Sequence, residues 1–239
     1  MSNFWKSDLE VGYYDKILDK GLKHSRGLQA GWHNITFLKL KKFVEKNTAH
    51  LDYACGSGSF IGKYSEGQSL GIDLSEIQIN YAKEKYGQNG EFKTIDEFNF
   101  ADYEDYFDLI TVAGLLEFID IKEAENLIVD LKKTLNRNGK IILTTPNYGG
   151  AFGFLQKIVY LFSDVNYDNE LKTKYNLELI QSLNLENHFE RVSIKKIITI
   201  GWFFSLFSFD LGIKINNFIE SLTNNKFGYL LLIELNKEI

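Results

Sequence analysis

From residue 50 onward, short apolar runs alternate with amphipathic stretches whose apolar residues recur at helical spacing. The expected strands are residues 50–54, 69–73, 91–95, 107–113 and 139–145, and the expected helices are 59–65, 75–87, 121–136 and 175–185. Because strands that alternate with helices form parallel sheets covered on both faces, this pattern predicts a doubly wound α/β domain. At the start of the second helix, Ser75 and Gln78 have the spacing of a capping box.

The two ends of the chain depart from this alternation. Residues 9–46 have a helical pattern with a glycine-containing break around residues 21–31. Near the other end, residues 191–200 and 228–234 read as strands, and a mixed segment separates them. We therefore expect an N-terminal helical unit over residues 1–48. A larger domain then covers residues 49–239, with an insertion at about 201–227 over the carboxyl edge of the sheet, where ligands bind in open α/β folds.

A glycine-rich turn follows the first expected strand, in the stretch Leu51-Asp52-Tyr53-Ala54-Cys55-Gly56-Ser57-Gly58. Glycines have no Cβ, so the backbone of this turn can approach a bound ligand closely. Asp73 stands at the end of the next strand, where a carboxylate can accept hydrogen bonds from a ribose diol. The combination predicts a site for a nucleoside-containing cofactor.

The turn does not have the spacing of a dinucleotide fingerprint. That fingerprint places glycine at the first, third and sixth positions. Here the sixth position is Ile61 when the count begins at Gly56, and Ser59 when it begins at Ala54. With Asp52 two residues before a small residue, the pattern instead resembles the first motif of class I S-adenosylmethionine-dependent methyltransferases, although their usual first glycine is Ala54 here.

This resemblance implies a mostly parallel seven-stranded sheet with a reversed last strand, an N-terminal helical lid and S-adenosylmethionine as the cofactor. The cofactor-binding residues that it implies are Asp52, Ala54, Gly56, Gly58, Asp73, Leu74, Asp96 and Gly114. Asp73 would bind both ribose hydroxyls, and Asp96 the adenine amino group. Leu74 or Ile72 would pack on the adenine ring, and Gly114 would border the sulfur. A solvated loop charge is an equal alternative for Asp96.

The motif of this chain does not include a histidine that could act as a general base. Many relatives have a histidine directly after the position of Glu117, but this chain has Phe118 there. We interpret Glu117 as structural. His24 and His33 of the N-terminal unit are the catalytic candidates, because histidine titrates near neutrality. Their alternative is ordinary packing or a surface position.

Composition and charge exclude several classes of ligand and cross-link. The net charge of −5 argues against binding a nucleic-acid backbone. The single cysteine, Cys55, excludes an intrachain disulfide and is interpreted as a small buried residue. No cluster has metal-ligand spacing, so we expect no metal. The first residues lack the apolar core of a signal peptide, which makes a cytoplasmic location the expectation.

Two aromatic-rich runs, residues 151–162 and 201–213, are too short to span a bilayer. They fit a core, a hydrophobic acceptor pocket or an interfacial membrane contact. The sequence therefore predicts methyl transfer to a small, hydrophobic or lipid-like acceptor at oxygen or nitrogen, with peripheral lipid contact as an option and the oligomeric state open. The alternatives are a nicotinamide-dependent oxidoreductase, which the missing glycine disfavours, and a non-catalytic nucleoside-binding module.

Overall fold

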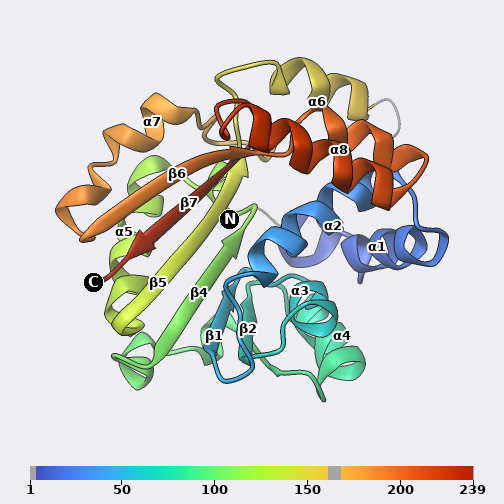
Figure 1. Ribbon diagram of the computed structural model, residues 1–239. Coiled ribbons are helices and arrows are strands. Elements are labelled where there is room, and N and C mark those ends of the chain that lie inside the picture. The colour runs from blue at the N-terminus through green and yellow to red at the C-terminus, as the bar shows by residue number, and fades with distance from the viewer. Residues whose placement is uncertain (1–3, 161–167, 239) are drawn as a thin grey trace.

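The computed structural model describes residues 4–160 and 168–238. Its strands form one sheet in the order β3-β2-β1-β4-β5-β7-β6 (Figure 1). Their bounds are β1 Ala49–Tyr53, β2 Gln68–Asp73, β3 Glu91–Thr94, β4 Phe107–Ala113, β5 Leu135–Pro146, β6 Arg191–Ile197 and β7 Leu230–Asn236. Strands β1 to β5 pair in parallel, and β7 runs antiparallel to both β5 and β6. The seven-stranded sheet with a reversed last strand is confirmed.

Helices cover both faces of this sheet, as the alternating pattern predicts. They are α1 Tyr13–His24, α2 Leu28–Lys41, α3 Ser59–Lys63, α4 Glu76–Tyr86, α5 Ile121–Thr134, α6 Phe152–Tyr160, α7 Leu177–Ser182 and α8 Phe209–Leu222. A short π-helical turn, Phe4–Asp8, precedes α1. Residues 161–162 of the first aromatic-rich run and residues 1–3 of the expected N-terminal unit lie outside the described residues.

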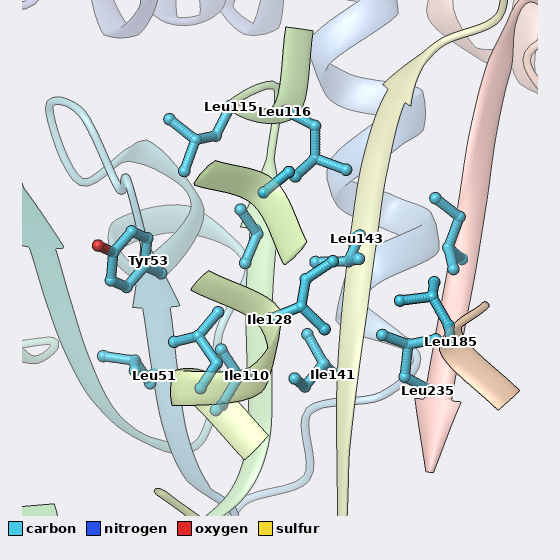
Figure 2. Close-up of a cluster of buried hydrophobic side chains, with 14 of the residues drawn as sticks. Leu51, Tyr53, Ile110, Leu115, Leu116, Ile128, Ile141, Leu143, Leu185 and Leu235 are labelled. Atoms are coloured by element: carbon cyan, nitrogen blue, oxygen red, sulfur yellow. The ribbon is translucent and has the colours of Figure 1, made fainter. Parts of the chain in front are cut away.

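Alternate residues of the strands enter two different cores. On one face, Leu51, Ile110 and Ile141 pack with α5 and α7 in one buried cluster. Figure 2 shows Ile128 of α5 lying over this face of the sheet. On the other face, Leu109 and its neighbours pack with α2 and α3. The period of two that separates these faces is that of strands buried on both sides.

Several element boundaries differ from the expected ones. Strand β5 begins at Leu135 instead of residue 139, because Leu135 pairs with Phe107 across a register shift in β4–β5. This pairing ends α5 at Thr134 instead of residue 136. The N-terminal helical stretch is divided at Ser25 and Gly27, whose φ angles are +51° and +138°.

The capping box expected at α4 is wrong. Ser75 does precede the helix, but its hydroxyl donates to the main-chain oxygen of Lys6 at 3.1 Å. The Gln78 side chain accepts from the N–H of Gly12 at 2.9 Å and is also buried. Both side chains are occupied by long-range contacts, so they attach the N-terminal segment to α4.

The segment between β6 and β7 lies at the carboxyl edge of the sheet. Because β6 runs parallel to β5, its end is at the same edge as the ends of β1 to β5. There a short 3₁₀ segment, Ile200–Leu206, leads into α8. Figure 1 shows α8 and α6 beyond the ends of β4 and β5, next to α2. Among the residues that the model describes, no helix is long and apolar enough to cross a bilayer.

Candidate functional site

A cavity of about 530 Å³ opens at the carboxyl ends of the central strands. The N-terminal helices, α6 and the segment after β6 contribute the rest of its wall. Its large apolar side chains are aromatic residues together with a similar number of leucines and isoleucines. The aromatic ones are Trp5, Tyr14, Trp32, Phe37, Tyr53, Phe60, Phe118, Tyr148, Phe152 and Trp202. No lysine or arginine is among the described residues that line it. The charged lining groups are therefore acidic.

The glycine-rich turn after β1 forms one end of this cavity. Gly56 has a φ of +53°, and a Cβ built there would have no atom within 4 Å, so its backbone faces open space. Ala54 holds a φ of +64°, in the left-handed region that costs a residue with a Cβ about 1 kcal/mol. Ala54 occupies the position where the resembled motif has glycine. The backbone shape of the motif is thus kept with a strained alanine.

Gly58, the next glycine of the turn, has close neighbours instead of open space. It is absent from the described cavity wall. A Cβ at this residue would lie 2.8 Å from the ring of Phe92 and 2.9 Å from Ala82, both on the opposite side. Gly58 therefore allows the turn to pack on α4 and β3, which is a structural role.

Asp73 is fixed by the main chain on either side of it. Its Oδ2 accepts from the N–H of Gly56 at 2.8 Å, and its Oδ1 accepts from the N–H of Ser75 at 2.9 Å. Burial raises the pKa of Asp73, and these backbone hydrogen bonds oppose the rise. The main-chain N–H of Leu74 also acts on this carboxyl. An ionised carboxyl has about four acceptor positions, so acceptor capacity remains for a ligand. Leu74, beside it, also lines the cavity.

Asp52 lies at the end of a buried hydrogen-bond chain. Thr111 donates to Asp52 Oδ1 at 2.6 Å, and the same hydroxyl oxygen is 2.8 Å from Nε2 of His50. Because Thr111 has one proton to give, Nε2 of His50 must be the protonated nitrogen. Its Nδ1 then accepts from Ser69, at 2.9 Å. Burial raises the pKa of Asp52 to about 7, against the effect of the Thr111 hydrogen bond.

His50 and Thr111 were not singled out by the sequence. The available signal was spacing, since residues two apart on a strand share a face. Burial lowers the pKa of His50 to about 3, so this histidine is neutral at physiological pH. Both residues act on the cavity only through Asp52.

The structure separates the two candidate histidines. His24 is the last residue of α1, is exposed, and is not on the described cavity wall. His33 of α2 does line the cavity. Its ring lies edge-on to Tyr14 at 5.3 Å between centroids. Burial lowers the pKa of His33 to about 4, which keeps it neutral.

Asp96 and Gly114, expected at opposite ends of the cofactor, differ in placement. Gly114 follows β4, has a φ of +70° and lines the cavity. Asp96 is exposed and off the described wall, while its neighbour Ile95 is on it. A capping box between Thr94 and Glu97 sets the orientation of this short turn. The contact of Asp96 with adenine stays a prediction.

Comparisons with known proteins agree with this geometry. A family model for a methyltransferase domain matches residues 51–139. The fold is similar to that of an S-adenosylmethionine-dependent methyltransferase from Archaeoglobus fulgidus, with a TM-score of 0.56, 18% identity, and coverage of 85% of this chain and 94% of that chain. Residues 51–139 therefore carry a methyltransferase domain, and the chain has the fold of S-adenosylmethionine-dependent methyltransferases. Its cofactor is S-adenosylmethionine, and it is an enzyme rather than a binding module.

Two further proteins are similar to this methyltransferase. The uncharacterized protein RP028 of Rickettsia prowazekii (strain Madrid E) is 25% identical over 203 residues, which are 75% of this chain and 81% of that protein. The magnesium protoporphyrin IX methyltransferase of Synechocystis PCC 6803, solved with bound S-adenosylhomocysteine, has a TM-score of 0.54 and 17% identity. The structural alignment covers 97% of this chain and 90% of the Synechocystis chain.

The cavity of the methyltransferase suits this cofactor on its own geometry. S-adenosylmethionine carries positive charge on its sulfonium and its ammonium group, and the charged side chains on the described wall are carboxyls. The open space beside Gly56 leaves room for a ligand against the backbone. The remaining acceptor capacity of the Asp73 carboxyl suits the hydroxyls of a ribose.

Glu117 is a cavity residue that the sequence reading set aside as structural. It is 5% exposed and lines the wall. Thr145 donates to its Oε2 at 3.1 Å. Burial raises the pKa of Glu117 to about 7. The next residue, Phe118, also lines the cavity and packs on Trp5 with 4.5 Å between ring centroids.

Proposed function

We propose that this methyltransferase acts on a small, hydrophobic or lipid-like acceptor, which it methylates at oxygen or nitrogen. The observation that carries the proposal is the composition of the cavity wall, which is largely apolar and has no lysine or arginine among its described residues. A phosphate or carboxylate group buried there would have no cation to pair with, which is costly. Neutral or cationic acceptors with apolar bodies fit this wall.

The cofactor would be held by one end of the cavity. We assign the ribose hydroxyls to Asp73 and the methionine portion to the turn at Ala54 and Gly56. Asp52 would face the ammonium group through water. Leu74 with Ile95 would contact the adenine, and Gly114 would border the sulfur. These assignments rest on the placement of the residues on the wall and on the resemblance of the motif.

The bound cofactor supplies an electrophilic methyl group on a sulfonium sulfur. The residues of this chain have to align the acceptor with that methyl group and exclude water. Trp5 against Phe118, and Trp32 against Trp202 at 5.2 Å, place apolar rings around the acceptor space. His33, neutral and on the wall, is a candidate to accept a proton. Its low pKa makes it a weaker base than an ordinary histidine.

The lid and the cap of this site would be the N-terminal helices and the segment at about 201–227. Trp202 of that segment donates its indole N–H to the main-chain oxygen of Leu28 at 2.7 Å. Lys39 of α2 pairs with Glu220 of α8. These contacts support a closed acceptor space in which the two units act together.

The outer surface of the cap supports contact with lipid. On α8, Leu211, Phe218 and Leu222 are spaced to share one stripe and are 43%, 67% and 74% exposed. The opposite face holds Asn216 and Glu220, which are buried and hydrogen bonded to each other. The helix thus has its apolar side outward. We propose that this stripe touches the surface from which a lipid-like acceptor is taken.

A transfer assay tests the proposed acceptor class. The protein is incubated with radiolabelled S-adenosylmethionine and, separately, with a neutral-lipid and quinone extract or with a water-soluble extract. We expect label to enter the organic phase of the first sample. Label found only in the water-soluble acceptors would overturn the hydrophobic assignment while leaving the methyltransferase activity in place.

A further inference from the structure

Glu117 is the buried carboxyl of the cavity that the proposed cofactor contacts do not use. It lies in the short 3₁₀ turn Leu116–Phe118 that follows β4. One of its oxygens, Oε2, accepts from Thr145, which is fully buried. Within residues 4–160 and 168–238, no other residue forms a hydrogen bond to Oε1 or an ion pair with Glu117, and only the main-chain N–H of Glu117 itself also acts on the carboxyl. The carboxyl therefore has an oxygen with acceptor capacity that the described protein does not use.

The backbone of Glu117 is held firmly. Its main-chain oxygen accepts from the N–H of Lys172 at 2.9 Å and from that of Thr173 at 3.2 Å. Thr173 is in turn hydrogen bonded through its hydroxyl to the main-chain oxygen of Ile119, at 2.9 Å. The side chain is anchored from β5 and the backbone from the segment before α7. A group held from two sides is preorganised, as a site for a ligand requires.

The free oxygen lies beside Gly114. A Cβ built on Gly114 would be 3.6 Å from Oε1, and no closer atom stands in that direction. In the function proposed above, Gly114 borders the sulfur of the cofactor. Oε1 would then be next to the place where the methyl group leaves the sulfur, on the side of the aromatic acceptor space.

We propose that Glu117 binds the acceptor, with Oε1 accepting a hydrogen bond from the O–H or N–H group that is methylated and then taking its proton. This inference rests on the proposed function. As the methyl carbon bonds to the acceptor atom, its bond to sulfur breaks and the sulfonium becomes a neutral thioether. The acceptor proton moves to Oε1. It passes to water when the product leaves, which restores the carboxylate.

This role defines the acceptor class more closely. A buried carboxylate repels an anionic group, so acids and phosphates near the reacting atom are excluded. A protonated or neutral amine, or a hydroxyl, is favoured. Burial gives Glu117 a pKa of about 7, against about 4 for His33. Between the two, Glu117 holds a transferred proton better near neutral pH, and it still has a large ionised fraction there.

Binding probes test this without an identified acceptor. The protein is saturated with S-adenosylhomocysteine, and the affinities of n-octylamine, 1-octanol and octanoate are measured by calorimetry. In the unaltered protein we expect octylamine to bind at least about tenfold more tightly than octanoate, the scale of one charge-assisted hydrogen bond. In Glu117→Gln this preference should disappear, while the affinity for S-adenosylhomocysteine changes less than about twofold.

Two further variants make the outcome decisive. Glu84→Gln removes one exposed carboxylate from α4 and should keep the preference. Glu117→Asp keeps the charge and should retain part of it, even if Glu117→Gln folds poorly. The octylamine affinity should also rise with pH through about 7 in the unaltered protein. The rise should be clearly smaller in Glu117→Gln, because the amine remains charged from about pH 5.5 to about 8.5 and Asp52 is then the remaining wall carboxyl with a pKa of about 7.

Each failure has its own meaning. If S-adenosylhomocysteine does not bind the unaltered protein, the proposed function is wrong. If it binds but Glu117→Gln prefers octylamine as strongly as before, the assignment of Glu117 is wrong and the proposed function stands. If octanoate binds best in the unaltered protein, both the assignment of Glu117 and the proposed preference for neutral or cationic acceptors are wrong.

Discussion

Gly56 of the first turn and Asp73 at the end of β2 are joined by a hydrogen bond of 2.8 Å from the N–H of Gly56 to Oδ2 of Asp73. The same carboxyl that is assigned to the ribose therefore also sets the shape of the turn assigned to the methionine portion. Removal of Asp73 should affect both ends of the cofactor.

Asp73→Ala should weaken the binding of S-adenosylhomocysteine by about 1.5–3 kcal/mol, the scale of hydrogen bonds to a charged group. Asp73→Asn, which keeps an acceptor oxygen for the turn, should lose less. Isothermal titration calorimetry measures both. An unchanged affinity in Asp73→Ala would contradict the ribose assignment.

Ala54→Gly should leave the free energy of unfolding unchanged or raise it by up to about 1 kcal/mol. The φ of +64° strains alanine at this position, and glycine adopts it freely. Ala124→Gly in the buried part of α5 is the control and should lose about 1 kcal/mol or more. Denaturant unfolding compares them, and equal losses would show that the turn carries no strain.

Thr111→Val should move the pH dependence of S-adenosylhomocysteine binding to higher pH. In the unaltered protein Asp52 titrates at about 7, so the carboxylate that faces the ammonium group forms as pH rises through that value. Loss of the Thr111 hydrogen bond, which lowers the pKa, should raise this midpoint. Thr134→Val, in a buried threonine of α5, should leave the midpoint in place. Identical profiles for all three proteins would contradict the role given to Asp52.

Asp15→Asn should remove a contribution to the free energy of unfolding that the unaltered protein loses at acid pH. Burial acts to raise the pKa of Asp15, but hydrogen bonds from Lys85, Ser59 and Tyr86 outweigh it and lower the pKa to about 2. The stabilisation is therefore complete above the unfolded value of about 3.8, and is lost as pH falls toward 2. It amounts to at most about 2 kcal/mol.

Unfolding free energies measured at about pH 5 and about pH 2.5 should differ less in Asp15→Asn than in the unaltered protein. Because Asp15 joins α1 to Ser59 at the start of α3, the variant should also weaken cofactor binding. If both proteins lose the same unfolding free energy between these pH values, ionised Asp15 does not stabilise the contact between the N-terminal helices and the turn.

Replacement of Leu211, Phe218 and Leu222 together by serine should reduce binding to phosphatidylcholine vesicles by roughly tenfold or more, because the apolar stripe of α8 is lost. The three side chains are exposed, so the fold should persist. Lys214→Ser, beside the stripe, serves as the control and should bind as before. Flotation of vesicles measures the bound fraction. If the unaltered protein does not bind vesicles, the proposed lipid contact is wrong.

The sequence predicted those features that depend on local pattern. The strands around Leu51 and Leu109, the turn at Gly56 and the acid at Asp73 all lie within short segments whose spacing specifies their structure. The antiparallel direction of the last strand was predicted only from the resemblance to the family, because the local sequence pattern of a strand does not show in which direction its neighbour runs.

Positions decided by long-range packing were not predictable in this way. Gly56 and Gly58 look alike in the motif, but only Gly58 has Phe92 and Ala82 against it. Ser75 and Gln78 have the spacing of a cap and are instead bound to residues near the N-terminus. Glu117 reaches the cavity because Thr145 of a distant strand and the backbone at residues 172–173 hold it there.

Calorimetric titration of the purified protein with S-adenosylhomocysteine, and in parallel with NADH, tests the central claim most directly. We predict saturable one-to-one binding of S-adenosylhomocysteine that Gly56→Val abolishes without unfolding the protein, and no heat from NADH. Binding of NADH with no response to S-adenosylhomocysteine would contradict the account.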